Sequence, residues 1–261
     1  MNRIIEIDFF KGLAVIFMMI SHIGVFGNIT VKNLIHYKKF KFNINLKIGE
    51  TNMFHYIGVI SHIIFIILVG VNMVSSYHKS LEYKETNKET PYSSFRKRNQ
   101  RRALIILVYG LVMSLLARIF FGKWYILFGI FQFIGVSILI AVYFVEDYNI
   151  YKIILALIFI LIASSVKLSN SSTLYNFLIG KTKDKFMDYF PLIPYFAYVL
   201  VGIVAGKCMY KKINLFNDTF KYSSLNTIAK IGQKALPIYF GHLIILFIVV
   251  RLCVRKPVIH I

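Results

Sequence analysis

An acid, a base and an imidazole lie on one predicted helix near the start of the chain. Asp8 and Lys11 are three residues apart, so a helix places them on the same face within pairing distance. His22 follows eleven residues after Lys11, about 16 Å further along a helix axis, inside an apolar stretch. A buried imidazole that stays neutral keeps one nitrogen able to accept a proton, which suits a general base or a nucleophile. Ionisable groups are costly inside a membrane, so these three residues predict a functional site.

Each of these residues also has a purely structural interpretation. Asp8 and Lys11 would form an interfacial ion pair where the helix begins, with Asp8 favourably placed near the helix N-terminus. His22 would be a hydrogen-bonded contact between two helices. Taken alone, the three residues leave both interpretations open.

Further polar residues occur at membrane depth in other apolar stretches: His242, Arg118 and Gln132. Buried ionisable groups generally face the interior of a bundle or a water-filled cavity. We therefore predict one polar cavity in which His242 is catalytic together with His22 and Asp8, and which Gln132 and Arg118 help to line. A proton-coupled transporter or channel would use the same residues, and a non-catalytic scaffold would use them only to join helices.

Two more histidines, His55 and His62, lie seven residues apart in the second apolar stretch, on one helix face but two turns from each other. A metal site would need ligands one turn apart, with carboxylates or thiolates nearby. We therefore predict no metal, and we expect His55 to line the polar cavity.

A dense run of cations leads into the third apolar stretch, and it consists of Arg96, Lys97, Arg98, Arg101 and Arg102. One interpretation is a topology anchor on anionic lipid. The other is a clamp in which the four arginines, supported by Lys11, hold the phosphates of a cytosolic donor. Guanidinium groups match the geometry of phosphate, which is the basis of this second interpretation, whereas the first is the commoner role of such a run.

Membrane-length helices must position these residues. Of 261 residues, 57% are hydrophobic and 16% are charged, and apolar windows of roughly 18 residues recur along the chain. We predict an all-α, polytopic transmembrane helix bundle that forms a single domain over residues 1–261. About seven spans are expected, at residues 8–27, 54–75, 103–121, 124–145, 150–166, 189–206 and 235–254.

Lysine and arginine together number 31, against 11 aspartates and glutamates. In a membrane protein, such an excess attracts anionic lipid and controls topology. Nucleic acid is not an expected partner, because the aromatic residues lie inside the apolar stretches and not among exposed cations. The most cationic segment, 76–102, is predicted to be cytoplasmic, which also places the N-terminus in the cytoplasm. The sequence makes no prediction of oligomeric state.

The stretch from Arg3 through Asp8, Lys11 and Gly12 to His22 resembles the opening motif of the heparan-alpha-glucosaminide N-acetyltransferase catalytic-domain family, especially its short prokaryotic members. Four later segments are similar to the same family in the same order: 65–71, 126–137, 188–196 and 231–242. The chain departs from the family where Lys11 replaces the usual Arg, and where Gln132 stands at a position that is often His in short members.

The resemblance implies a transmembrane acyltransferase in a prokaryotic cell membrane. Acetyl-CoA would be the cytosolic co-substrate, and a sugar or envelope glycan would accept the acetyl group. His22, alone or with His242, would then either accept the acetyl group or deprotonate the acceptor.

Overall fold

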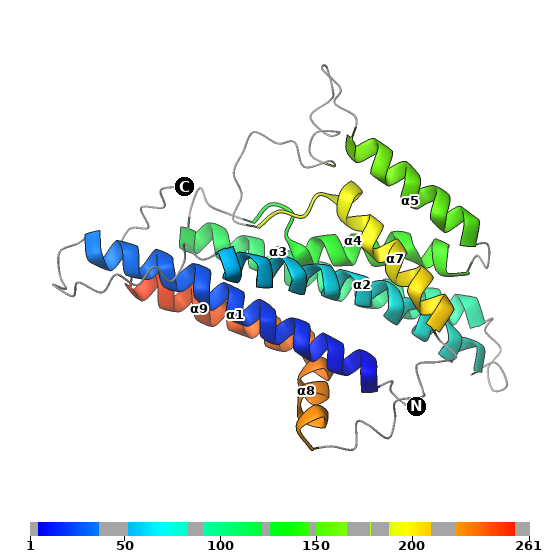
Figure 1. The fold of residues 1–261 in the computed structure, drawn as a ribbon, viewed down its shortest axis with the longest axis horizontal. Coiled ribbons are helices and arrows are strands. Elements are labelled where there is room, and N and C mark those ends of the chain that lie inside the picture. Colours follow the sequence, from blue (N-terminus) through cyan, green and yellow to red (C-terminus); the bar gives the residue numbers. More distant parts are fainter. Residues whose placement is uncertain are drawn as a thin grey trace. The chain divides into compact units, whose positions relative to one another are not determined.

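A computed structural model describes residues 5–36, 52–82, 91–121, 126–146, 150–165, 178, 188–209 and 223–253. Nearly all of these residues are helical, which confirms the predicted all-α class. The described helices are α1 (Ile5–His36), α2 (Asn52–Glu82), α3 (Pro91–Phe121), α4 (Ile130–Glu146), α5 (Ile150–Ser165), α7 (Leu192–Met209), α8 (Ser223–Gln233) and α9 (Ala235–Cys253) (Figure 1).

Each predicted span coincides with one helix: α1, α2, α3, α4, α5, α7 or α9. By length and hydropathy, α1, α2, α3 and α7 are long and apolar enough to cross a membrane. Helices α8 and α9 form a fifth candidate, bent by 79° where they join, and α8 turns away from α9 in Figure 1. The remaining apolar helices are shorter, since α4 has 17 residues and α5 has 16. The described residues thus give four or five full-length spans, compatible with the prediction of about seven.

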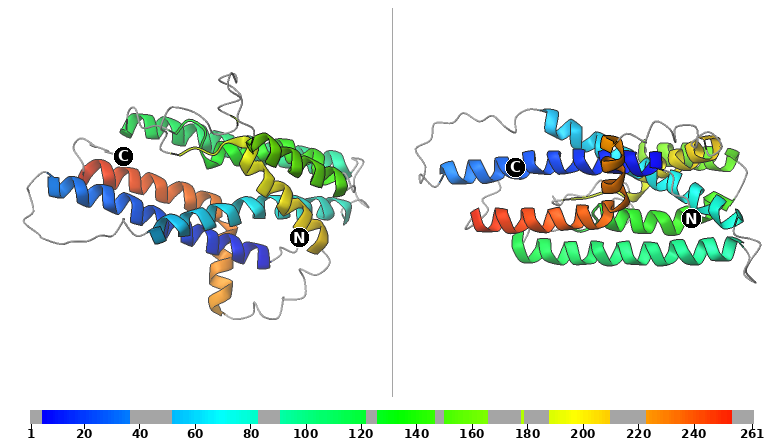
Figure 2. Two further views of the ribbon diagram at one scale, coloured as in Figure 1. Left: turned by 45° about the horizontal axis from the view of Figure 1, so that its top comes forward. Right: turned by 90° about the horizontal axis from the view of Figure 1, so that it is seen from below.

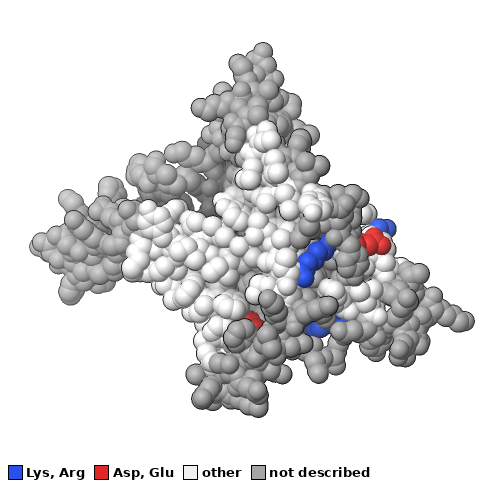
Figure 3. All heavy atoms as spheres, turned by 45° about the vertical axis from the view of Figure 1, so that its right-hand side comes forward, with Lys and Arg blue, Asp and Glu red and all other residues white. Residues whose placement is uncertain are grey.

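The exposed surface of the described helices is rich in large apolar side chains, as a lipid-facing surface requires. Leu111, Ile119 and Tyr151 are exposed by 65%, 66% and 77%. On the face drawn in Figure 3, the described atoms are almost all uncharged, and Lys, Arg, Asp and Glu occupy a few small patches. The structure therefore belongs to an integral membrane protein.

Helices α4 and α7 begin later than predicted, because the residues before them are extended and not helical. Phe128 and Tyr189 form a parallel β-bridge, and the backbone N–H of Phe190 donates to the carbonyl of Phe128 over 2.9 Å. Pro191 lacks the backbone N–H that would continue α7 in the N-terminal direction. Hydropathy alone does not distinguish such apolar extended segments from the helices that follow them.

The chain divides into two compact units. The first comprises Met1–Phe65 and Phe216–Ile261, and contains α1, the start of α2, α8 and α9. The second, Ile66–Leu215, contains the rest of α2 with α3, α4, α5 and α7. The single domain over residues 1–261 stays a prediction.

In the first unit, α1 contacts both α8 and α9, and α1 and α9 run side by side in both views of Figure 2. The crossing of α1 with α8 brings two backbones into direct contact. A Cβ atom on Gly232 would lie 1.7 Å from the carbonyl oxygen of Asp8, and one on Gly12 would lie 2.1 Å from that of Ile228. Only glycine allows this approach, which fixes the position of Asp8 and Lys11 on α1.

In the second unit, α2 crosses α7 in the same way. A Cβ on Gly70 would lie 2.2 Å from the carbonyl oxygen of Val199, and one on Gly202 would lie 2.0 Å from that of Ile67. Helix α3 packs along α4, and α7 contacts both α4 and α5. Small residues thus set the close helix contacts of both units, as is common in membrane proteins.

Candidate active site

Two histidines distant in sequence meet in the first unit. Nδ1 of His22 on α1 lies 3.0 Å from Nε2 of His242 on α9. The rings are nearly parallel, with an interplanar angle of 17° and centroids 5.3 Å apart. His242 is only 9% exposed. At this distance one ring nitrogen donates a hydrogen bond and the other accepts it.

The second nitrogen of His242 decides which one donates. Nδ1 of His242 lies 3.4 Å from the carbonyl oxygen of Ile238, and a carbonyl can only accept. We therefore assign the proton of neutral His242 to Nδ1, so its Nε2 accepts from Nδ1–H of His22. This assignment leaves the lone pair of His22 on Nε2, the atom that can take a proton or attack a carbonyl carbon.

A phenol and a third imidazole accompany this pair. The ring centroid of Tyr239 lies 5.9 Å from that of His22 and 4.9 Å from that of His242. The centroid of His62, on α2, lies 6.4 Å from that of His22. His55 was the residue of this stretch predicted for the site, and His62 was not among the predicted site residues. The available signal was depth, because His62 lies well inside the apolar stretch whereas His55 stands near its start.

A hydrogen bond next to His22 holds the first turns of α2 against α1. The hydroxyl of Ser21 donates to the carbonyl of Phe54 over 2.8 Å. A Cβ on Gly24 would meet the ring of Phe54 at 2.6 Å, so the two helices also touch one turn further on. These contacts fix the part of α2 that carries His62 beside the part of α1 that carries His22.

The ion pair expected at the start of α1 is present. Nζ of Lys11 lies 3.2 Å from Oδ1 of Asp8, and both side chains are largely buried. This pair lies eleven residues before His22 on the same helix, about 16 Å along its axis. Its functional role stays a prediction.

The predicted cavity residues occupy different surroundings. Nε2 of Gln132 donates to the carbonyl of Gly110 over 2.8 Å and to the hydroxyl of Ser114 over 2.7 Å, so this buried amide joins α4 to α3. Arg118 is exposed near the end of α3 in the second unit. His55 is exposed in the first unit, with its ring 6.0 Å from that of Tyr56. The placement of Gln132 is that of a helix-joining residue.

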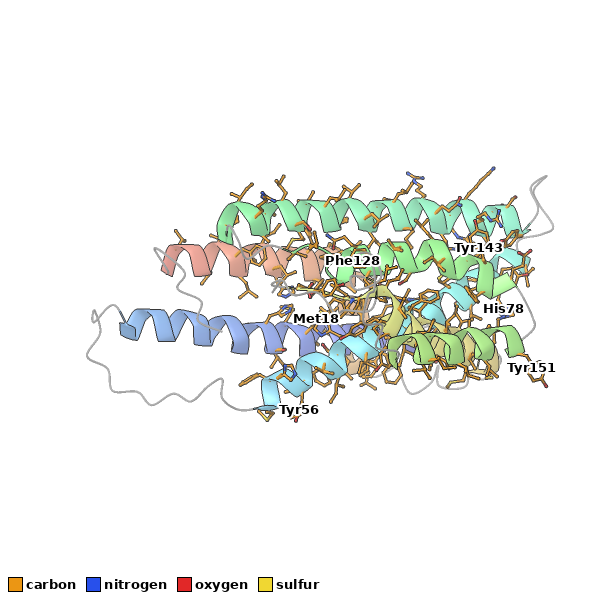
Figure 4. All side chains as sticks on the ribbon, turned by 90° about the horizontal axis from the view of Figure 1, so that it is seen from above. Met18, Tyr56, His78, Phe128, Tyr143 and Tyr151 are labelled. Atoms are coloured by element: carbon orange, nitrogen blue, oxygen red, sulfur yellow. The ribbon has the colours of Figure 1, made fainter. Side chains whose placement is uncertain are left out.

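Two of the predicted phosphate-binding arginines are engaged in contacts between helices. The guanidinium of Arg96 lies over the rings of Tyr92 and Tyr143, 4.5 Å and 5.0 Å from their centroids, and Figure 4 marks Tyr143 near the end of α4. Nη2 of Arg98 donates to Ser80 Oγ over 2.6 Å and to the carbonyl of Ser76 over 2.9 Å. Arg101 and Arg102 are exposed. Arg96 and Arg98 thus tie α3 to α4 and α2.

The part of the chain that the structure describes contains no group of three or more His, Cys, Asp or Glu side chains arranged to hold a metal ion.

Asp188, for which no role was predicted, lies outside the helices and caps α4. Its Oδ2 accepts the backbone N–H of Ile130 over 3.2 Å. A Cβ on Gly129 would lie 2.7 Å from the same oxygen, so the carboxylate is tightly enclosed. Removal from water raises the pKa of Asp188 to about 6, although the hydrogen bond from Ile130 opposes this shift.

This raised pKa predicts a pH-dependent stability. The folded state holds the proton of Asp188 more tightly than the unfolded state, whose pKa is near 3.8, so stability is greatest below about pH 4 and falls as pH rises through 6. Asp188→Asn keeps an acceptor for Ile130 without a charge. We expect it to be about 1–2 kcal/mol more stable than the parent at pH 7.5, with the difference vanishing near pH 4.

Thermal unfolding in detergent between pH 4 and 8 measures this difference. The control is Asp188→Ala, which lacks the acceptor and should be less stable than Asp188→Asn at every pH. A parent protein that gained stability over Asp188→Asn as pH rose would contradict the assigned direction of the shift.

Comparison with known proteins gives one match. The model of the family described as "Heparan-alpha-glucosaminide N-acetyltransferase, catalytic" matches residues 3–244. No curated protein and no solved structure matches the chain.

Proposed function

This chain belongs to the heparan-alpha-glucosaminide N-acetyltransferase catalytic family, and from that membership we propose that it transfers an acetyl group from acetyl-CoA to a sugar or envelope glycan. The family makes it a membrane transferase, and the donor and acceptor are our proposal. We further propose that it resides in a prokaryotic cell membrane with its N-terminus in the cytoplasm. The observation that carries the proposal is the 3.0 Å contact between His22 and His242.

In the proposed reaction, His22 is the general base. Its Nε2 takes the proton of an acceptor hydroxyl or amine while the acceptor oxygen or nitrogen attacks the carbonyl carbon of the thioester. The carbon–sulfur bond then breaks, and His22 Nε2 returns the proton to the departing sulfur, so that CoA leaves as the free thiol. His242 accepts the hydrogen bond from Nδ1–H of His22 throughout, which keeps the lone pair on Nε2 and stabilises the imidazolium that forms. The pair ends the cycle in its starting protonation state.

The donor phosphates need a cation on the cytosolic side, and we propose Lys11 for this role. Lys11 stands on the same helix as His22, and the separation of about 16 Å leaves room for the flexible pantetheine arm between phosphate and thioester. Asp8 orients the Lys11 ammonium over 3.2 Å. Arg96 and Arg98 are less suited to this role, because their guanidinium groups are already used between helices.

Purified protein in lipid vesicles, supplied with radiolabelled acetyl-CoA and a glucosamine-containing glycan, tests the proposal. We expect label in the glycan and free CoA thiol in equal amounts. Lys11→Gln should weaken acetyl-CoA binding about tenfold, the effect of losing one charged hydrogen bond. The control Lys234→Gln, which removes an exposed cation at the bend between α8 and α9, should change binding less than twofold.

Two outcomes would overturn the proposal. One is the absence of both acetyl-CoA binding and transfer in protein that is folded and vesicle-inserted. The other is a proton or solute flux through those vesicles that depends on His22, which would indicate a transporter.

A further inference from the structure

Helix α3 presents one apolar face outward along most of its length. Ile105, Val108, Val112, Leu115 and Ile119 follow one another at steps of three or four residues, and each is exposed by between 39% and 66%. The opposite face carries Ala103, Ile106, Met113 and Ala117, which are all buried. Helix α3 packs along α4, and Figure 4 shows that side chains also extend from the side of α3 that faces away from α4. Hydrocarbon chains are the natural neighbours of such a face.

Two exposed cations continue this face at its N-terminal end. Lys97, Arg101 and Ile105 are each four residues apart, so they lie above one another on the same side of the helix. From Arg101 to Ile119 the helix rises about 27 Å, close to the roughly 30 Å of a hydrocarbon core. When the apolar face contacts acyl chains, Lys97 and Arg101 therefore lie where the headgroups begin.

The local charge favours an anion at this position. No aspartate or glutamate occurs between Pro91 and Phe121, and Arg98 and Arg102 flank the two cations. Arg98 is held by Ser76 and Ser80 at the end of α2, which keeps the first turns of α3 in place.

We propose that Lys97 and Arg101 bind the phosphate of an anionic phospholipid whose acyl chains lie along the outward face of α3. A lipid phosphate and a soluble phosphate share the same chemistry at the two cations. Only the lipid also places its own acyl chains against Ile105 and Val108, which a soluble anion does not contact. The inference does not depend on the proposed acetyl transfer.

Native mass spectrometry of the detergent-solubilised protein, titrated with phosphatidylglycerol, tests this inference. Each lysine or arginine near an anionic lipid surface strengthens binding about fivefold. Lys97→Gln combined with Arg101→Gln should therefore weaken phosphatidylglycerol binding about 25-fold. The charge-conserving pair Lys97→Arg with Arg101→Lys should keep the affinity within about threefold. Phosphatidylcholine should bind weakly to all variants.

The control is Arg96→Gln, which removes one positive charge, half the change of the double variant, from the same helix but from the side that faces Tyr92 and Tyr143. This variant should change phosphatidylglycerol affinity less than twofold when only the ion signal of the folded protein is used. Inorganic phosphate at the lipid concentration should not compete. The inference is overturned if inorganic phosphate displaces the lipid, if the three variants lose affinity equally, or if Lys97→Gln with Arg101→Gln weakens acetyl-CoA binding as much as lipid binding.

Discussion

Replacing His22 with alanine should lower kcat for acetyl transfer by about 10²- to 10⁴-fold, the usual contribution of a general base. The reason is that Nε2 of His22 is the proposed proton acceptor. His242 is buried, and its two ring nitrogens contact His22 and the carbonyl of Ile238, so it cannot accept the proton in place of His22 without moving. Acetyl-CoA affinity should stay within about threefold, because the proposed phosphate ligand Lys11 is about 16 Å away along the helix. Steady-state transfer and equilibrium binding on the same preparation measure the two quantities.

Variants of His242 separate a positioning role from a packing role. His242→Gln offers an amide oxygen that can still accept the hydrogen bond from Nδ1–H of His22, whereas His242→Ala offers none. We expect a loss of about tenfold for the first and about 100-fold for the second, both in kcat. A purely structural contact between helices would instead change thermal stability in both variants and leave kcat per folded molecule unaltered.

The control for His22→Ala is His78→Ala, which removes an imidazole from α2 in the second unit, where the ring packs against Tyr77. Its kcat should be within about twofold of the parent value. If His22→Ala retained more than a tenth of the parent activity, His22 would be a packing contact and the general-base mechanism would be wrong.

Hydropathy predicted the helices well because a membrane imposes a simple constraint on each of them separately. A helix that crosses the hydrocarbon core needs about 20 apolar residues, and this requirement can be read from one stretch at a time. For that reason each predicted span coincides with a helix. The starts of α4 and α7 were predicted too early, because the residues before them are apolar but extended. Their backbone groups form hydrogen bonds in a β-bridge between Phe128 and Tyr189, not in a helix.

The contacts between helices could not be predicted in this way, since they depend on two stretches together. Hydropathy predicted that His22 and His242 are buried imidazoles, but nothing in the sequence specified that their ring nitrogens lie 3.0 Å apart. Gln132 was predicted from its depth alone to line a cavity, a role that stays a prediction, and nothing in the sequence specified that its amide joins α4 to α3. Helix α8 was missed altogether, because it is short and its exposed face is polar.

The cations show why charge alone did not decide between two functions. Arg96, Arg98 and Arg101 belong to one run in the sequence, yet the helix directs them to different surroundings. Arg96 lies over aromatic rings, Arg98 is bound by serines of α2, and Arg101 is on the face that continues into exposed apolar residues. A period of 3.6 residues distributes neighbouring charges around the axis, so a cluster in sequence is not a single binding site in space.

Gly232→Ala should destabilise the protein by about 3 kcal/mol or more, since the added methyl group meets backbone that cannot rotate away. A Cβ at this position would lie 1.7 Å from the carbonyl oxygen of Asp8 and 2.7 Å from the backbone nitrogen of Gly12. Helices α1 and α8 must therefore separate, which also displaces Asp8 and Lys11. We expect the unfolding temperature in detergent to fall by about 5–10 °C, together with weaker acetyl-CoA binding.

The matched control for this prediction is Gly241→Ala on α9, which makes the same change where a Cβ would meet no atom within 4 Å. Alanine is favoured over glycine inside a helix by up to about 1 kcal/mol, so this variant should melt at the parent temperature or slightly above it. Helix propensity alone would make Gly232→Ala more stable than the parent. Any fall in the stability of that variant must therefore come from the contact of α8 with α1. Equal melting temperatures for the two variants would mean that the backbones of α1 and α8 are not in contact.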